Sequence, residues 1–411
     1  MTDYAVIWEW VSFAVRWLHI VTAMAWIGSS FYFIALDLGL RKSPDLPPGA
    51  YGEEWQVHGG GFYHIEKYLV APDRLPDRLT WFKWESYSTW LSGAALLMIL
   101  YWSGAELYLI DRSKSDLSSW QAILISGGSL AIGWLVYDFL CKSRLGDRPN
   151  ALMLLLFVLL TAMAWGYDQV FTGRAALLHL GAFTATIMTA NVFMIIIPNQ
   201  KIVVEDLRSG RVPDARYGII AKLRSTHNNY LTLPVIFLML SNHYPLSFAT
   251  EYNWVIAALV FLMGVTIRHY FNTMHAGKGR PHWTWAVTAI IFITMMWLSA
   301  AGDREFTNPA GREADVSGLA EHAFFADVRD SIQRRCSSCH ANEPVWSGVS
   351  IPPKSVVLET DADILRQARQ IYIHSGLSLA MPPANVTSMN AEERRRIVLW
   401  YRESVGSEIG L

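Results

Sequence analysis

The sequence predicts an all-α protein in which an eight-helix transmembrane bundle is followed by a small helical domain. The 411-residue chain is 52% hydrophobic and only 17% charged, whereas soluble domains are about 25% charged. Long apolar runs fill roughly the first three quarters of the chain, and a polar segment rich in Arg and Glu follows. The net charge of −1 gives no sign of nucleic-acid binding, and three cysteines are too few for a disulfide framework.

Eight apolar segments approach the length of about 20 residues that a membrane-spanning helix needs. They are residues 11–36, 87–110, 120–141, 151–171, 175–197, 228–244, 252–271 and 282–301. The sixth is the weakest, because it is short and contains Pro234. The first is too long for the apolar part of a cleavable signal peptide, so we expect none.

The Lys and Arg residues of the loops predict the orientation. With the N-terminus outside, the inner loops 37–86, 142–150, 198–227 and 272–281 carry 17 Lys and Arg residues, and the outer tail and loops carry 3. An even number of spans then places the C-terminal segment outside as well. We therefore expect a bacterial inner-membrane protein, in contact with membrane lipid, whose two ends lie in the periplasm.

Composition divides the chain into a membrane domain (1–301), a linker (302–318) and a C-terminal domain (319–411). The C-terminal domain is predicted to form helices over 323–334, 361–375 and 391–404. Asn390 and Glu393 have the spacing of a capping box before the last helix. Ile397, Trp400 and Tyr401 would form the buried stripe of that helix.

The strongest chemical signal is Cys336-Ser337-Ser338-Cys339-His340, the C-x-x-C-H attachment motif of c-type haem. The two thiols can form thioethers to the haem vinyl groups, and His340 can bind the iron. A zinc or thiol redox site is the alternative, but no second Cys/His pair follows at zinc spacing and no βαβ pattern surrounds the motif. We therefore expect a class I-like cytochrome c domain with one covalent haem c.

The second axial ligand should be a Met or His downstream of the motif. Met381 precedes Pro382 and Pro383, which would fix an extended loop able to present its sulfur. Met389 lies just before the last helix, where a Met more often fills the core, and His374 is a weaker candidate. We therefore predict that His340 and Met381 bind the haem iron.

Ionisable side chains inside spans are costly and often mark function. His19 in the first span and His179 in the fifth would lie in the outer third of the membrane. They could hold a second haem, of type b, between helices, or they could be interfacial histidines hydrogen-bonded to neighbouring helices.

Polar residues at the ends of the sixth and seventh spans are candidates for binding a small planar ligand. They are His227, Asn228, Asn229, His243 and His269. The same side chains could equally satisfy backbone groups at helix ends. In the first inner loop, the glycine run after His58 suggests close backbone approach, without the lysine of a phosphate-binding loop.

Several stretches together resemble the PuuD-type membrane urate oxidase (urate hydroxylase) family, and the resemblance covers essentially the whole chain. The stretches are Trp55 with the His-Gly-Gly-Gly-Phe-Tyr run at 58–63, His-Asn-Asn-Tyr-Leu-Thr-Leu-Pro at 227–234 and Ser-Asn-His-Tyr-Pro at 241–245. The resemblance implies oxidation of urate to 5-hydroxyisourate, with electrons leaving through haem c rather than to O₂ as peroxide. It supplies no urate-binding residue. The first span also resembles that of the HemJ and CopD membrane families, which is in keeping with a haem at His19.

The electrons would pass to a soluble cytochrome c or a terminal oxidase. Two alternatives remain at this point. One is a respiratory module that oxidises quinol and has no purine site, and the other is a non-catalytic membrane anchor for a cytochrome.

Overall fold

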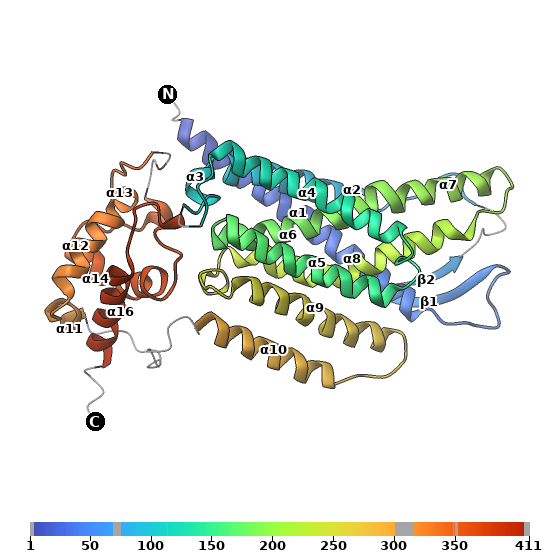
Figure 1. The fold of residues 1–411 in the computed structure, drawn as a ribbon. Helices are drawn as coiled ribbons and strands as arrows, with labels where there is room; N and C mark the ends of the chain where they lie inside the picture. The colour runs from blue at the N-terminus through green and yellow to red at the C-terminus, as the bar shows by residue number, and fades with distance from the viewer. Residues whose placement is uncertain are drawn as a thin grey trace.

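The computed structural model describes residues 4–68, 75–112, 114–300, 316–347, 349 and 352–406. Figure 1 shows a bundle of long helices with a smaller helical unit at one end, close to the start of α1. The segment 302–315 of the predicted linker lies outside the described residues.

The bundle contains helices at all eight places where the sequence predicts a span. They are α1 (Tyr4–Gly39), α2 (Trp84–Leu96) with the π-helix η1 (Leu97–Trp102), α4 (Ser119–Lys142), α5 (Pro149–Val170), α6 (Gly173–Ala190) continued by η2 (Asn191–Ile196) and α7 (Ile197–Arg208), α8 (Ala215–Ser241), α9 (Asn253–His275) and α10 (Trp283–Ala300). The short helices α3 (Ala105–Tyr108) and η3 (Pro245–Ser247) lie between them.

Five of these helical stretches are long and apolar enough to cross a membrane, which identifies a membrane protein. They begin at Trp10, Ser119, Pro149, Gly173 and Asn253. The stretch Trp283–Ser299 is apolar but shorter. The full count of eight spans, and the side of the membrane that each end occupies, stay predictions.

Helix α8 continues through Pro234, the residue that made the sixth span the weakest prediction. Helix α9 approaches closely at this point, because a Cβ atom on Gly264 would lie 2.6 Å from the Pro234 ring. Glycine at 264 therefore lets the proline ring pack between the helices. The helix also begins at Ala215, well before the predicted start at 228.

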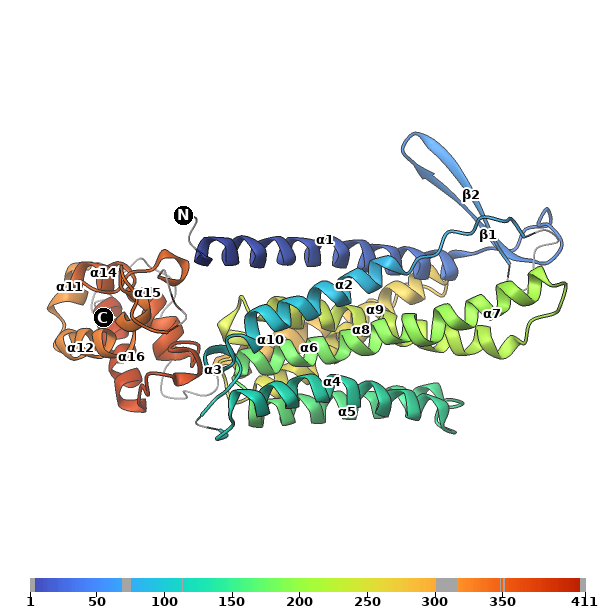
Figure 2. The same ribbon diagram turned by 90° about the horizontal axis from the view of Figure 1, so that it is seen from above.

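The loop between the first two predicted spans forms a β-hairpin, so the expectation of an all-α fold is wrong here. Strand β1 (Ala50–His58) pairs antiparallel with β2 (Gly61–Tyr68), and His58 lies opposite Gly61. Gly59 and Gly60 have φ values of 60° and 81°, which a two-residue turn requires. The glycine run thus makes a tight turn. Figure 2 shows the hairpin projecting from the end of the bundle opposite the C-terminal unit.

The C-terminal unit has its own hydrophobic core, which includes Ile332, Ile364, Ile397 and Trp400. Its helices are α11 (Val316–Glu321), α12 (Phe325–Arg335), α13 (Ser337–His340), η4 (Pro353–Ser355), α14 (Asp361–Arg366), α15 (Ala368–Ile371), η5 (Tyr372–Leu377), η6 (Pro383–Asn385) and α16 (Ala391–Gly406). A separate core holds α4, α5, α6 and their neighbours together in the bundle.

The predicted cap of the last helix is present. The Asn390 side chain accepts from the Glu393 N–H at 2.9 Å, and the Glu393 carboxylate accepts from the Asn390 N–H at 2.8 Å. Ile397, Trp400 and Tyr401 are buried, as the apolar stripe predicted. Local sequence signals therefore located this helix correctly.

The bundle and the C-terminal unit touch through the loop around Met381. Ala380 packs against the core of the bundle, and η6 contacts α3. The segment that carries the predicted axial methionine is therefore at the junction of the two parts.

Candidate functional site

The Cys-x-x-Cys-His motif forms a single helical turn at the end of α12. The Cys336 carbonyl accepts from the Cys339 N–H at 3.1 Å and from the His340 N–H at 2.9 Å. Both thiols are free of disulfides; Cys336 is buried and Cys339 is half-buried. Burial raises the pKa of Cys336 to about 12.

The His340 ring is held by one nitrogen. Its Nδ1 donates to the Val356 carbonyl at 2.8 Å, which leaves Nε2 available to a metal ion, and a hydrogen bond at the other ring nitrogen is usual for a metal-ligating histidine. Among the described residues, no group of three or more His, Cys, Asp or Glu is placed to hold a metal ion, so a zinc site gains no support. The turn therefore fits a covalent haem.

A buried arginine organises the loop that carries Met381. Arg394 of α16 donates to the carbonyls of Ser375 and Met381, each at 2.8 Å, and to the Asn385 side chain at 3.2 Å. Burial lowers the pKa of Arg394 from its ordinary value. The guanidinium thereby ties the loop to the last helix.

The three candidate axial residues differ in their surroundings. Met381 is only partly buried and lines a cavity. Met389 is 3% exposed and belongs to the core of the unit, although it also reaches the cavity wall. His374 lines the same cavity, and its Nε2 is 3.0 Å from the Gln370 side chain. Met381 as axial ligand stays a prediction that this geometry fits.

One cavity of about 2030 Å³ joins the motif to the bundle. Its wall in the C-terminal unit includes Cys336, Cys339, His340 and Met381. Its wall in the bundle comes from α1, η1, α6 and α8 and the residues that follow α8. A ligand in the bundle half of this space would lie beside a group attached to the two cysteines.

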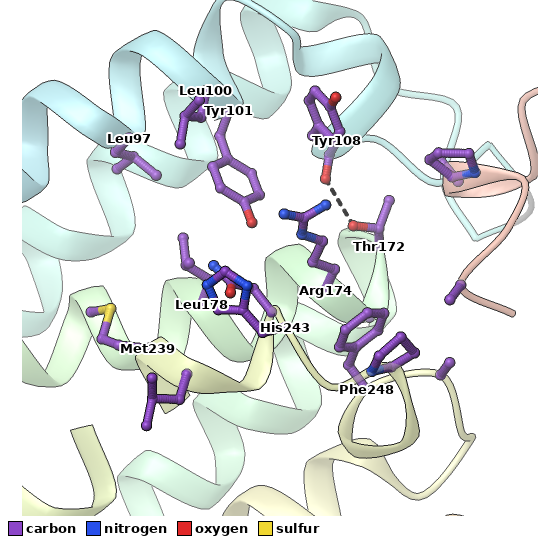
Figure 3. Close-up of a pocket in the computed structure, with 18 of the residues that line it drawn as sticks. Leu97, Leu100, Tyr101, Tyr108, Thr172, Arg174, Leu178, Met239, His243 and Phe248 are labelled. Atoms are coloured by element: carbon purple, nitrogen blue, oxygen red, sulfur yellow. Dashed lines mark hydrogen bonds between the residues drawn. The ribbon is translucent and has the colours of Figure 1, made fainter. Parts of the chain in front are cut away.

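Three polar side chains face one another in the bundle half, and Figure 3 shows them. Tyr101 comes from η1, Arg174 from the first turn of α6, and His243 from the segment after α8. Thr172 fixes the approach of these elements, since its hydroxyl donates to the Tyr108 carbonyl at 2.8 Å and caps α6 by accepting from the Ala175 N–H. The cluster thus joins three separate parts of the chain.

The charges that act on His243 are positive. Partial burial lowers the pKa of His243 below its ordinary value, and the charges of Arg174, Arg16 and Lys354 add to the effect. Lys354 belongs to the C-terminal unit and the two arginines to the bundle. The junction is therefore positively charged around a neutral imidazole.

His19 lines this cavity, but His179 is not among the described residues that line it. His19 Nδ1 lies 3.0 Å from the Thr89 carbonyl and 3.2 Å from the Ser92 hydroxyl. Gly93 packs against the imidazole, because a Cβ there would lie 2.9 Å from its Cε1.

Both ring nitrogens of His179 have protein partners. Nδ1 lies 2.8 Å from the Ala175 carbonyl and Nε2 lies 2.7 Å from the Ser126 hydroxyl, and the side chain is fully buried. The geometry of His179 matches the alternative of a histidine hydrogen-bonded within the bundle. A haem b between His19 and His179 stays an untested prediction, and the hydrogen bonding of His179 weighs against it.

His227 and Asn228 belong to a polar network deep in the bundle. His227 Nδ1 lies 2.7 Å from the Tyr137 hydroxyl, and Asn191 donates to Tyr137 at 3.0 Å and to Asn228 at 2.9 Å. Arg224 is 1% exposed and pairs with the Asp138 carboxylate at 2.6 Å. Asn228 also reaches the wall of the cavity.

Two further candidates, Asn229 and His269, lie apart from this network. Asn229 accepts from Arg268 at 3.3 Å and from Asn272 at 3.0 Å, and the Arg268 guanidinium lies 4.5 Å from the centre of the Phe31 ring. His269 is exposed on α9 beside Trp283. The five candidates are thus not brought together, and only His243 lies in the cluster at the junction.

Sequence reasoning missed Tyr101 and Arg174. Arg174 lies in the first turn of α6, where a positive charge opposes the helix dipole. That unfavourable position was a usable signal. The sequence around Tyr101 carries no comparable signal, because a tyrosine near the end of an apolar span is common at membrane interfaces.

Comparison with known families finds one match. Residues 5–299 match the family described as urate oxidase N-terminal, which covers all the described helices from α1 to α10. Comparison with curated proteins and with solved structures finds no match to this chain. The match extends over more than half of the chain and includes one wall of the cavity, so the protein belongs to the urate oxidase N-terminal family and is an oxidoreductase of the urate oxidase type.

Proposed function

We propose that this membrane protein oxidises urate to 5-hydroxyisourate and delivers the electrons to a haem c bound covalently by Cys336 and Cys339. His340 and Met381 would be the axial ligands. A soluble cytochrome c or a terminal oxidase would then take the electrons, without formation of peroxide. We place the C-terminal unit in the periplasm of a bacterial inner-membrane protein, on the strength of the loop charges.

The reaction balances with water as the source of oxygen. Urate and one water give 5-hydroxyisourate, two protons and two electrons. A C-type haem supplies a one-electron acceptor with a high potential when a Met and a His bind its iron. Each urate therefore requires two successive electron transfers to the acceptor.

The observation that carries the proposal is the cavity shared by the two parts of the chain. The family match covers the bundle wall, and the Cys-x-x-Cys-His turn forms the opposite wall. A purine held in the bundle half would share this cavity with a haem attached to Cys336 and Cys339, and the haem would supply a one-electron acceptor there. In this proposal His243, whose pKa is lowered by burial and by nearby positive charges, would accept a proton during attack by water.

The test is anaerobic reduction of the purified haem protein. Urate should reduce the haem absorption band with two electrons per urate consumed, and turnover with soluble cytochrome c should give no hydrogen peroxide. The Cys336→Ala variant, stained for haem on a denaturing gel, should lose the covalent band.

Two outcomes would contradict the proposal. Stoichiometric peroxide during turnover would show that O₂ is the direct oxidant. Reduction of the haem by quinol and not by urate would identify a respiratory electron-transfer module, and reduction by neither would indicate a membrane anchor.

A further inference from the structure

We propose that Arg174 and Tyr101 form the recognition site for the substrate, a planar purine anion, at the junction of the bundle and the C-terminal unit. This inference rests on the proposed function and adds the residues that would bind the substrate and the charge that the substrate would carry. Urate carries one negative charge at neutral pH, so its site needs a cation and donors matched to its oxygens.

Tyr101 provides a donor without a protein partner. Its side chain is 3% exposed, and its buried hydroxyl makes no hydrogen bond of 3.5 Å or less to any residue in the described part of the chain, although the charge of Arg174 acts on it. An unsatisfied buried hydroxyl costs about 1–3 kcal/mol. Figure 3 shows this hydroxyl pointing toward Arg174 and His243 across the cavity. A bound ligand would satisfy it.

Arg174 provides the positive charge. Its Nε is buried and has no hydrogen-bond partner within the described ranges. Its guanidinium lies 5.6 Å from the centre of the Tyr108 ring, which orients the group without neutralising it. Because a cation in the first turn of α6 opposes the helix dipole, its presence there is not explained by the stability of the helix.

The cations at the junction form no ion pair with a described residue. No contact within 4 Å joins Arg174, Arg16 or Lys354 to a carboxylate in the part of the chain that the structure describes; Asp111 and Glu251 also line the cavity, and the third lining carboxylate, Asp168, is paired with Lys114 at 2.8 Å. An uncompensated cation in a partly buried site favours an anionic ligand. Arg174 can bind such a ligand through two parallel N–H bonds.

The walls suit a flat ring. Leu97, Leu178 and Phe248 surround the polar cluster with apolar surface (Figure 3). This combination of a few convergent polar groups within an apolar cavity is typical of small-molecule sites. The polar edge of the purine would face Arg174 and Tyr101, and its ring would contact the apolar side chains.

A propionate of the attached haem is the rival occupant, because its carboxylate is also an anion and the haem would be attached in the wall of the same cavity. The two occupants predict different consequences for Arg174. Loss of a substrate contact raises KM and leaves the haem unchanged, while loss of a propionate contact shifts the midpoint potential of the haem and leaves KM unchanged.

The experiment measures KM for urate, kcat and the haem midpoint potential in the full-length protein with soluble cytochrome c as acceptor. Arg174→Gln should raise KM about 10- to 100-fold, as expected for loss of a charge-assisted hydrogen bond. Arg174→Lys should recover part of the loss, and Tyr101→Phe should raise KM about tenfold. The midpoint potential should match the wild type in all three.

Arg112→Gln is the matched control, since Arg112 is an exposed cation near the outer end of the bundle that does not line the cavity. It makes the same charge change and should leave KM unaltered. An unchanged KM in Arg174→Gln overturns the inference, with or without a shifted potential. If the wild type does not oxidise urate, the proposed function fails, and equilibrium binding of radiolabelled urate to the wild type and Arg174→Gln still decides the recognition site.

Discussion

Two polar clusters in the bundle each contain an arginine, but only one of the two arginines has a carboxylate partner among the described residues. Deep in the bundle, Arg224 is paired with Asp138 and hydrogen-bonded to Asn191. At the junction with the C-terminal unit, Arg174 has no carboxylate partner among the described residues, and the Tyr101 hydroxyl has no hydrogen bond to them. Arg224, whose charge is neutralised by a carboxylate of the protein, holds helices together. Arg174, whose charge has no such partner, is available to an anionic ligand.

Under the proposed function, the cluster around His227 and Arg224 is also the less suitable place for the redox chemistry. His227 and His243 are 16 residues apart on or just beyond α8, which at ~1.5 Å per residue corresponds to ~24 Å. Arg268 is engaged by Asn229, Asn272 and the Phe31 ring. Some atoms there, such as His227 Nε2, also lack a described partner. Arg224 therefore differs from Arg174 in having a carboxylate partner, whereas Arg268, which lies apart from both clusters, has neutral hydrogen-bond partners.

The largest expected effect follows from the Arg224–Asp138 pair. Arg224→Gln leaves the Asp138 carboxylate with only its exposed partner Lys142, so we expect a loss of about 3 kcal/mol in the free energy of unfolding. Thermal unfolding in detergent would measure it, and KM for urate in the folded fraction should not change. Adding Asp138→Asn should restore part of the stability. A raised KM without loss of stability would transfer the ligand site to the cluster around His227 and Arg224.

The next effect concerns His243 as the proton acceptor. Its pKa lies below the ordinary histidine value of about 6.5, because burial and the charges of Arg174, Arg16 and Lys354 disfavour the protonated form. The ring is therefore neutral at pH 7, and kcat/KM should fall as the pH drops through this lowered pKa. His243→Gln should reduce kcat/KM by about 10²-fold and abolish the acid limb. An unaltered acid limb in this variant would show that another group accepts the proton.

A third effect concerns the Met381 loop, which borders the junction from the other side. Arg394→Met removes the hydrogen bonds to the carbonyls of Ser375 and Met381 and should destabilise the loop by about 2 kcal/mol. The near-infrared band of Met sulfur on ferric haem should weaken, and the midpoint potential should fall. Arg395→Met is the control, since Arg395 is exposed and pairs with Glu392.

Substitution of Met389 distinguishes a role in core packing from a role as iron ligand, by the same near-infrared band. Met389→Ala should lower the stability of the C-terminal unit and keep the band, because the side chain is buried in the core. Loss of the band in Met389→Ala but not in Met381→Ala would reverse the assignment of the axial ligand.

Sequence patterns identified the features that depend on residues close together in the chain. Apolar length located the helices, the Asn390–Glu393 spacing located the start of α16, and the Cys-x-x-Cys-His spacing located one wall of the cavity. The patterns could not show which distant polar residues meet. Tyr101, Arg174 and His243 come from three elements, and only the packing of these elements places them around one space.

The hairpin shows a second limit. The hairpin residues 50–68 lie between two long apolar segments, and their glycine run predicts only a close backbone approach, without indicating a turn. The positive φ values of Gly59 and Gly60 are compatible with a close backbone approach and with a tight turn. The pairing of His58 with Gly61 shows that they form a turn. The register, rather than the composition, decides between them.

The smallest expected effect tests whether His227 belongs with the structural network. Its Nδ1 is hydrogen-bonded to the Tyr137 hydroxyl at 2.7 Å, and the side chain is 1% exposed. His227→Gln keeps a polar group near Tyr137, so we expect a loss of about 1 kcal/mol in stability and a change in kcat/KM much smaller than that of His243→Gln. The two substitutions are chemically identical, one in each cluster, and differ only in whether the imidazole faces the junction. Equal losses of kcat/KM in both would mean that the reaction depends on the structural network as much as on the junction, and the distinction drawn from charge compensation would then fail.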